Sequence, residues 1–137
     1  MLHRSFHGAT CVAVVAVFLV CASKLEAQHR EGAIGDGSFY AIDVPQPWNG
    51  DLIVYAHGIV DPTAPVALPT TQDGFAGLRD GWLAQGLAVA ASSYSENGYA
   101  LKDAALHTRQ LTGLVAEQFG RPRRVYLVGH RSERWQR

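Results

Sequence analysis

The chain has 137 residues, in which 12 lysines and arginines balance 12 aspartates and glutamates to a formal net charge of zero. Outside the C-terminal end the basic residues are scattered among acidic ones, so nucleic acid is not an expected partner. Both cysteines, Cys11 and Cys21, lie within the first 27 residues. The remainder is long enough for one domain with a modest core, and it has no thiol for a disulfide or a cysteine-based metal site.

Residues 1–27 have the order of a secretory signal peptide. A basic head precedes an apolar run at residues 11–22. Leu25 and Ala27 form a cleavage site before Gln28, with Val20 and Ala22 as the competing site. The apolar run is shorter than the roughly 20 residues that a membrane-spanning helix needs, so no stable membrane span is expected. The sequence therefore predicts a secreted or periplasmic protein, with an uncleaved amphipathic anchor as the alternative.

The rest of the chain alternates predicted strands with predicted helices. Residues 28–37 are polar and glycine-rich and are expected to form a flexible segment. Three prolines make residues 59–73 a long loop. Strands that alternate with helices of this length predict a mostly parallel sheet. The predicted strands are 38–44, 52–56, 87–92 and 124–128, and the predicted helices are 74–85 and 100–119.

A His-Gly pair, His57 and Gly58, directly follows the second predicted strand. A sharp turn through glycine points backbone N–H groups into the crevice beyond the carboxyl edge of a parallel sheet, where they can bind an oxyanion. Taken alone, the pair is also compatible with an ordinary turn. The oxyanion interpretation gains weight from the residues at the end of the last predicted strand.

That strand ends in Gly129 and His130, which match the start of a Gly-x-Ser-x-Gly nucleophile elbow. The elbow needs a small residue before the nucleophile because the turn from strand to helix is tight, and Gly129 meets that need. The serine should come next, but Arg131 stands there and Glu133 takes the place of the closing glycine. Ser132 lies one position late, which makes it a displaced candidate nucleophile.

The order and spacing of these features resemble the N-terminal half of an α/β-hydrolase, over nearly all of residues 39–130. Among such proteins the chain is most similar to exported bacterial serine hydrolases with a Tyr-Ser-x-Asn-Gly stretch, here residues 94–98. The resemblance implies a three-layer α/β-hydrolase-like sandwich with a mostly parallel sheet. It also implies an esterase, lipase or peptidase class of activity on a small-molecule ester or amide.

Carried over residue by residue, the resemblance implies two parts of a catalytic site. His57 and Gly58 would open the oxyanion loop, with the backbone N–H of Ile59 as the donor. Gly129 and His130 would be the first two positions of the elbow.

The chain is expected to lack activity of its own. In this fold the acid and the histidine of the triad both follow the elbow, and here the sequence continues only to Arg137. The predicted organisation is a partial hydrolase domain at 38–130, cut short after the elbow strand, and an irregular tail at 131–137. An out-of-frame origin is one hypothesis for that tail.

The alternative is a catalytically inactive secreted binding or interaction module that uses the cleft between Gly58 and the proline-rich loop. No cofactor is predicted, and no histidine pair has metal-ligand spacing. An apolar last strand at an open sheet edge also predicts self-association through that edge.

Overall fold

The structure is a computed structural model that describes residues 27–72 and 74–129. The predicted signal peptide, except its last residue, lies outside the described residues, as do His130, Ser132 and the tail at 131–137. Within the described part, no helix is both long enough and apolar enough to cross a membrane.

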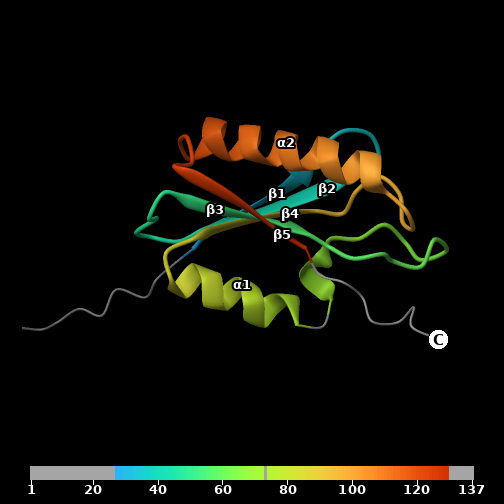
Figure 1. Ribbon diagram of the computed structural model, residues 1–137, viewed down its shortest axis with the longest axis horizontal. Coiled ribbons are helices and arrows are strands. Elements are labelled where there is room, and N and C mark those ends of the chain that lie inside the picture. Colours follow the sequence, from blue (N-terminus) through green and yellow to red (C-terminus); the bar gives the residue numbers. More distant parts are fainter. Residues whose placement is uncertain (1–26, 73, 130–137) are drawn as a thin grey trace, which may run out of the picture.

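Five strands form one sheet in the order β1-β2-β4-β3-β5, so that β1 and β5 are its two edges. Figure 1 shows α2 lying against one face of this sheet and α1 against the other. A short 3-10 helix, η1, precedes α1. The elements are β1 (Gln28–Ala33), β2 (Phe39–Val44), β3 (Asp51–Ala56), η1 (Pro69–Thr71), α1 (Phe75–Ala84), β4 (Ala88–Ser92), α2 (Leu101–Gln118) and β5 (Arg124–Gly129).

The prediction of a mostly parallel, three-layer α/β-hydrolase-like sandwich is wrong, because the sheet is mixed. Strand β3 pairs in parallel with β4 and with β5, whereas β2 pairs antiparallel with β1 and with β4. The described chain carries only two α-helices. The physical reason lies in the N-terminal connection: residues 34–38 form a tight turn, closed by a hydrogen bond from the Ile34 amide to the Ser38 carbonyl at 3.0 Å. A hairpin of this kind forces antiparallel pairing.

Strand β1 occupies most of the segment that was expected to be flexible. It carries the sequence Gln-His-Arg-Glu-Gly-Ala and is mostly exposed. A polar edge strand has no buried face and therefore no apolar alternation by which the sequence could reveal it.

The two faces of the sheet carry two separate cores, because successive side chains of a strand point to opposite faces. On the α2 face, Leu52 and Val54 of β3 pack in one cluster with Leu111 and Val115 of the helix. On the α1 face, the alternate β3 residues pack with the helix residue Phe75 and its neighbours. Strand β3 is thus buried on both sides, as its continuous apolar sequence indicates. This central strand holds the candidate site in place.

Candidate functional site

The candidate site lies where the parallel strands β3 and β5 end. Their register places Ala56 opposite Gly129, the last residue of each strand. Because the two strands run in the same direction, both chains leave the sheet at the same carboxyl edge. His57 and Gly58, which follow β3, and Gly129, which ends β5, therefore lie at the same edge of the sheet.

His57 is held at this edge by both of its ring nitrogens, and it is only 8% exposed. Its Nδ1 lies 2.8 Å from the Gly58 carbonyl oxygen, and its Nε2 lies 3.3 Å from the Ser93 carbonyl oxygen. Carbonyl oxygens only accept hydrogen bonds, so neither nitrogen faces a group from which it could take a proton. His57 is thus built to fix the turn, and it is not arranged as a general base.

Tyr94 forms the opposite wall of the turn. Its ring stacks on the His57 ring, with centroids 4.1 Å apart and the planes 28° from parallel. Its backbone has a φ of 57°, and no other described non-glycine residue has a positive φ. A bulky residue in the left-handed region is strained and persists only when its surroundings hold it. Burial, with a smaller contribution from Tyr55, raises the pKa of Tyr94 to about 12, so its hydroxyl stays neutral.

A buried hydrogen-bonded group holds Tyr94 in this conformation. The Tyr94 amide donates to the Ser92 Oγ at 3.1 Å, and the same oxygen lies 2.8 Å from the Nδ1 of His107. On the other side of the ring, the His107 Nε2 lies 3.5 Å from the Ser38 hydroxyl, which donates to the Ile34 carbonyl. All three side chains are buried. The arrangement links α2, the end of β4 and the β1–β2 turn to the wall of the candidate site.

Two loops close around the same edge. The Asn97 side-chain amide donates to the Ala64 carbonyl at 2.7 Å, and the Gly98 amide donates to the Val60 carbonyl at 3.0 Å. These bonds tie the loop after β4 to the proline-rich loop after β3. The carboxyl edge of the sheet beyond His57 is thus bordered by two connected loops.

The carboxylates near these loops accept hydrogen bonds from residues close to them in the chain. The Thr63 amide and hydroxyl donate to the Asp61 carboxylate, and these bonds lower the pKa of Asp61. The Ser95 hydroxyl and amide donate to Asp103 and lower its pKa in the same way. Neither carboxylate has a described hydrogen bond to a histidine, so neither forms the acid of a catalytic pair with His57 or His107.

The structure brings three of the predicted site residues to one edge and leaves the others untested. His57, Gly58 and Gly129 lie at the carboxyl ends of β3 and β5, and Ile59 follows them on a partly exposed turn. Their roles stay predictions, and His130 and Ser132 lie outside the described residues.

Sequence reasoning missed Tyr94 and His107. A histidine next to the apolar stripe of a predicted helix looks like a surface residue. The two hydrogen-bond partners of His107, Ser38 and Ser92, come from segments far apart in the sequence, so no local pattern indicates them.

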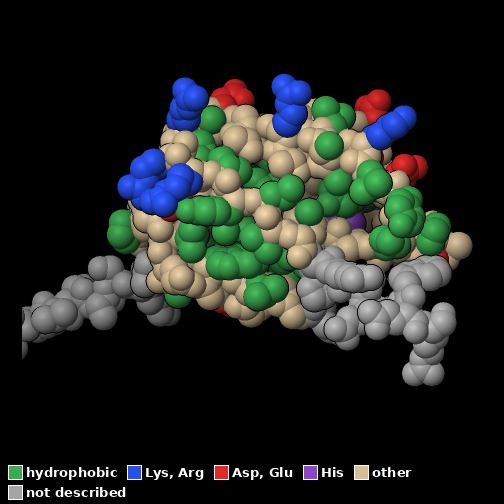
Figure 2. Space-filling model, in the orientation of Figure 1, with side chains coloured by type: hydrophobic (Ala, Val, Ile, Leu, Met, Phe, Trp, Pro, Cys, Tyr) green, Lys and Arg blue, Asp and Glu red, His purple; other side chains and the backbone are tan. Residues whose placement is uncertain are grey.

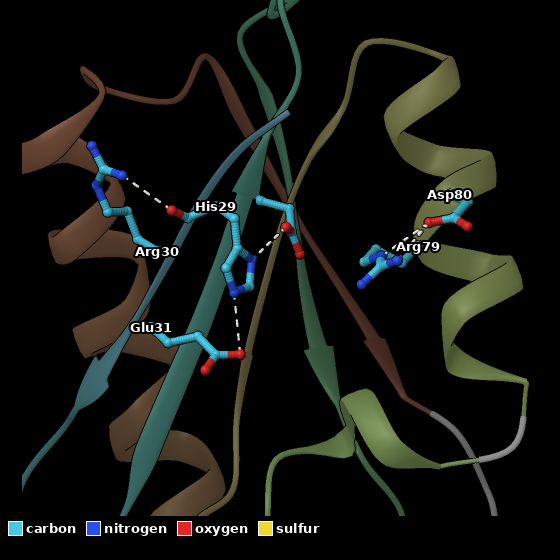
Figure 3. Close-up of polar contacts among 6 residues, drawn as sticks. His29, Arg30, Glu31, Arg79 and Asp80 are labelled. Carbon is cyan, nitrogen blue, oxygen red and sulfur yellow. Dashed lines mark hydrogen bonds and ion pairs between the residues drawn. The ribbon is translucent and has the colours of Figure 1, made fainter. Parts of the chain in front are cut away.

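A second polar group lies at the opposite side of the sheet, on β1 and β2. Figure 3 shows the His29 ring between two carboxylates, with Nδ1 2.7 Å from Asp43 and Nε2 3.2 Å from Glu31. The hydrogen bond to Asp43 is the main cause that raises the pKa of His29. The described residues contain no cluster of three or more histidine, cysteine or acidic side chains that could hold a metal ion.

One depression on the described surface lies apart from the candidate site. It has a volume of about 480 Å³ and lies between the β1–β2 hairpin and the residues around η1. Its lining includes neither His57 nor Gly129.

Comparison of the chain with protein-family models, with curated proteins and with solved structures found no match.

Proposed function

We propose that the chain is related to secreted serine hydrolases that act on ester or amide bonds, and that its described residues form the oxyanion side of such a site. The observation that supports this most is the register of β3 and β5, in which Ala56 lies opposite Gly129. Two features far apart in the sequence, each compatible with an ordinary turn, share one edge of the sheet. An oxyanion loop and a nucleophile elbow must meet in this way, because the attacked carbonyl carbon lies between them.

The rigid surroundings of His57 support the same role. An oxyanion hole works by holding backbone donors at fixed positions before charge develops, so that no reorganisation is needed during the reaction. Two carbonyl contacts and the Tyr94 stack restrain His57, and through it the turn at Gly58 and Ile59. The left-handed backbone of Tyr94 is the kind of maintained strain that accompanies functional sites.

The same proposal includes a lack of turnover by the 137-residue chain. Arg131 stands where the nucleophile of the elbow belongs. Among the described residues, the serine hydroxyls that contact a histidine ring are those of Ser38 and Ser92, and both are buried against His107. A hydroxyl that no substrate can reach cannot act as a nucleophile. The chain therefore binds the oxygen of a small-molecule ester, amide or carboxylate without cleaving it.

Binding at the proposed oxyanion site can be tested with a stable anion that imitates the tetrahedral intermediate, such as monoethyl butylphosphonate. In ¹H–¹⁵N NMR titrations, we expect saturable shifts of the Ile59 amide, which is the proposed donor, and of the adjoining Gly58 amide. Ile59→Pro removes one donor and should abolish the shift at Gly58. Ala67→Pro, at an exposed position of the same loop, is the matched control and should leave binding unchanged.

A hydrolysis assay distinguishes this proposal from one in which Ser132 is a working nucleophile. With p-nitrophenyl butyrate we expect no turnover above the background rate, in the chain and in Ser132→Ala alike. Turnover that disappears in Ser132→Ala would show that the displaced serine is a working nucleophile. Absence of phosphonate binding at Gly58 and Ile59 would remove the oxyanion side of the proposal and leave the binding-module hypothesis for the cleft.

A further inference from the structure

The outer edge of β5 is the most exposed apolar strand surface in the described chain. Leu127 is 62% exposed, Val125 43% and Tyr126 40%, although all three stand in the middle of a strand. Figure 2 shows hydrophobic side chains gathered over the middle of this side of the molecule. Among the described strands, β5 pairs with β3 alone, so no described strand bonds the backbone groups of its other side.

The apolar surface extends to both faces of the sheet at this edge. Val125 and Leu127 are in register with Leu52 and Val54, so they lie on the α2 face. The core on that face contains no residue of β5, so the helix packs over the other strands. Tyr126 lies on the α1 face, in register with Ile53. A partner that covers this edge must therefore extend the sheet and bring apolar groups to both faces.

We propose that β5 pairs antiparallel with β5 of a second copy of the chain, around a two-fold axis that passes through Leu127. An antiparallel pair in one sheet requires an axis perpendicular to the sheet, so that each face stays continuous and one residue lies opposite itself. With Leu127 on the axis, Tyr126 lies opposite Val128 of the other copy, and Val125 lies opposite its Gly129. No charged residue falls within this set of pairs.

The charges at the ends of the strand favour this register. Arg123 and Arg124 lie at the start of β5 and are held by the buried Asp51 carboxylate, with contacts of 3.3 and 3.5 Å. With Leu127 on the axis, the two Arg124 side chains lie at opposite ends of the seam, outside the apolar pairs formed by residues 125–129. An axis through Tyr126 would instead place Arg124 opposite the apolar Val128.

The other edge of the sheet explains why association stops at two copies. Strand β1 carries His29, Arg30 and Glu31 in its first half, and its histidine is engaged with Asp43 of β2. Charged edge strands resist pairing with another chain. A molecule with one open edge forms a closed pair, whereas a molecule with two open edges forms a fibre.

The test uses the full chain and charged substitutions at position 127, followed by sedimentation equilibrium. Leu127→Lys and Leu127→Glu each place two like charges at the axis and should weaken the dimer at least about tenfold. An equimolar mixture of the two variants should restore a dimer, because the introduced lysine of one copy then faces the introduced glutamate of the other. Leu106→Lys is the matched control, since Leu106 is an exposed leucine of α2 and should not affect association. Thermal unfolding of each variant checks that the fold is retained.

Each outcome decides the proposal. Loss of the dimer in both single variants together with its recovery in the mixture supports pairing through Leu127. A chain that is monomeric without substitution, a dimer that persists in Leu127→Lys, or a mixture that stays monomeric would overturn it. Open-ended assemblies in place of dimers would overturn it as well.

Discussion

The two edges of the sheet are built in opposite ways. Edge strand β1 is polar, and its His29 ring is bound between the carboxylates of Glu31 and Asp43. Edge strand β5 presents Leu127 and its apolar neighbours to solvent, with a charge only at its first residue. Both strands are exposed, so exposure alone does not distinguish them.

The two edges differ in where their ion pairs lie. At β1 the ion pairs lie along the strand and make a further strand unfavourable, because a new neighbour would have to cover charges. At β5 the ion pairs of Asp51 lie at the end of the strand and fix it to β3 without covering its outer side. One sheet thus has a protected edge and an edge that can accept a strand.

The largest expected loss of stability comes from removing buried hydrogen bonds in the interior between the two edges. Ser92 ends β4, and Ser92→Ala leaves the Tyr94 amide and the His107 Nδ1 without their partner. Two buried polar groups without hydrogen bonds should lower the free energy of unfolding by about 3 kcal/mol. Urea denaturation measures this, and both edges should lose stability together.

Ser95→Ala is the matched control for Ser92→Ala. Ser95 is exposed, and its hydroxyl bonds an exposed carboxylate. The loss should stay below about 1 kcal/mol. If the two serine variants lose equal stability, the buried group around His107 does not hold the wall of the site.

The next largest effect should come from removing the buried partner at the protected edge. Asp43→Ala takes away the carboxylate that bonds His29 at 2.7 Å, and Asp43 is a buried residue. Hydrogen bonds to charged groups of this kind contribute about 2 kcal/mol to the free energy of unfolding. Glu31→Ala, on the exposed side of the same ring, should cost less than about 1 kcal/mol. An equal loss in the two variants would show that burial does not strengthen the Asp43 contact.

A smaller loss of stability, which depends on pH, should be confined to β1. The pKa of His29 is raised above 6.5 by its carboxylate partners, so the charged ring stabilises the folded state. That contribution is complete below the unfolded pKa of about 6.5 and is lost as the pH rises through the folded pKa. Hydrogen exchange of the β1 amides, corrected for the intrinsic exchange rates, should therefore show protection that falls as the pH rises from about 6 to about 9.

His29→Gln removes the titrating ring and should make the protection of β1 independent of pH over the same interval. The amides of β5 provide the internal comparison, because no histidine contact is described for that strand. An equal pH dependence at both edges would contradict the assignment to His29.

The smallest expected effect concerns the Tyr94 hydroxyl, which lies between the two edges. Burial raises the pKa of Tyr94 to about 12 and also raises that of Tyr55, by a smaller shift, so Tyr94 should ionise last in a titration followed by ultraviolet absorbance. Tyr94→Phe should remove that late step and retain the stack on His57. A late step that persists in Tyr94→Phe would place the buried hydroxyl on another tyrosine.

The sequence allowed most element positions to be predicted, because buried strands and amphipathic helices have clear apolar patterns. The strand predicted at 52–56 and the helix predicted at 100–119 agree with β3 and α2 within one residue at each end. Strand direction was not predictable in the same way. The alternation of strands and helices suggested parallel pairing, while β1, which pairs antiparallel with β2 through a tight turn, had no apolar pattern to reveal it.

The site was predictable only in part, for a related reason. His57 and Gly58 stand directly after a recognisable strand, so their position at its carboxyl end followed from the sequence. The contact of His107 with Ser92 depends on tertiary packing between α2 and β4, and the left-handed conformation of Tyr94 depends on that contact in turn. Local patterns do not contain this information.

The contrast between the edges is tested most directly by hydrogen exchange of the β1 and β5 amides at increasing protein concentration. Successive amides of a strand point alternately to its two sides. Pairing of β5 with a second copy therefore predicts that the amides of residues 125–128 that face away from β3 gain protection as the concentration rises, while those of β1 do not change. Protection of β5 that is independent of concentration, or an equal gain at β1, would contradict the account.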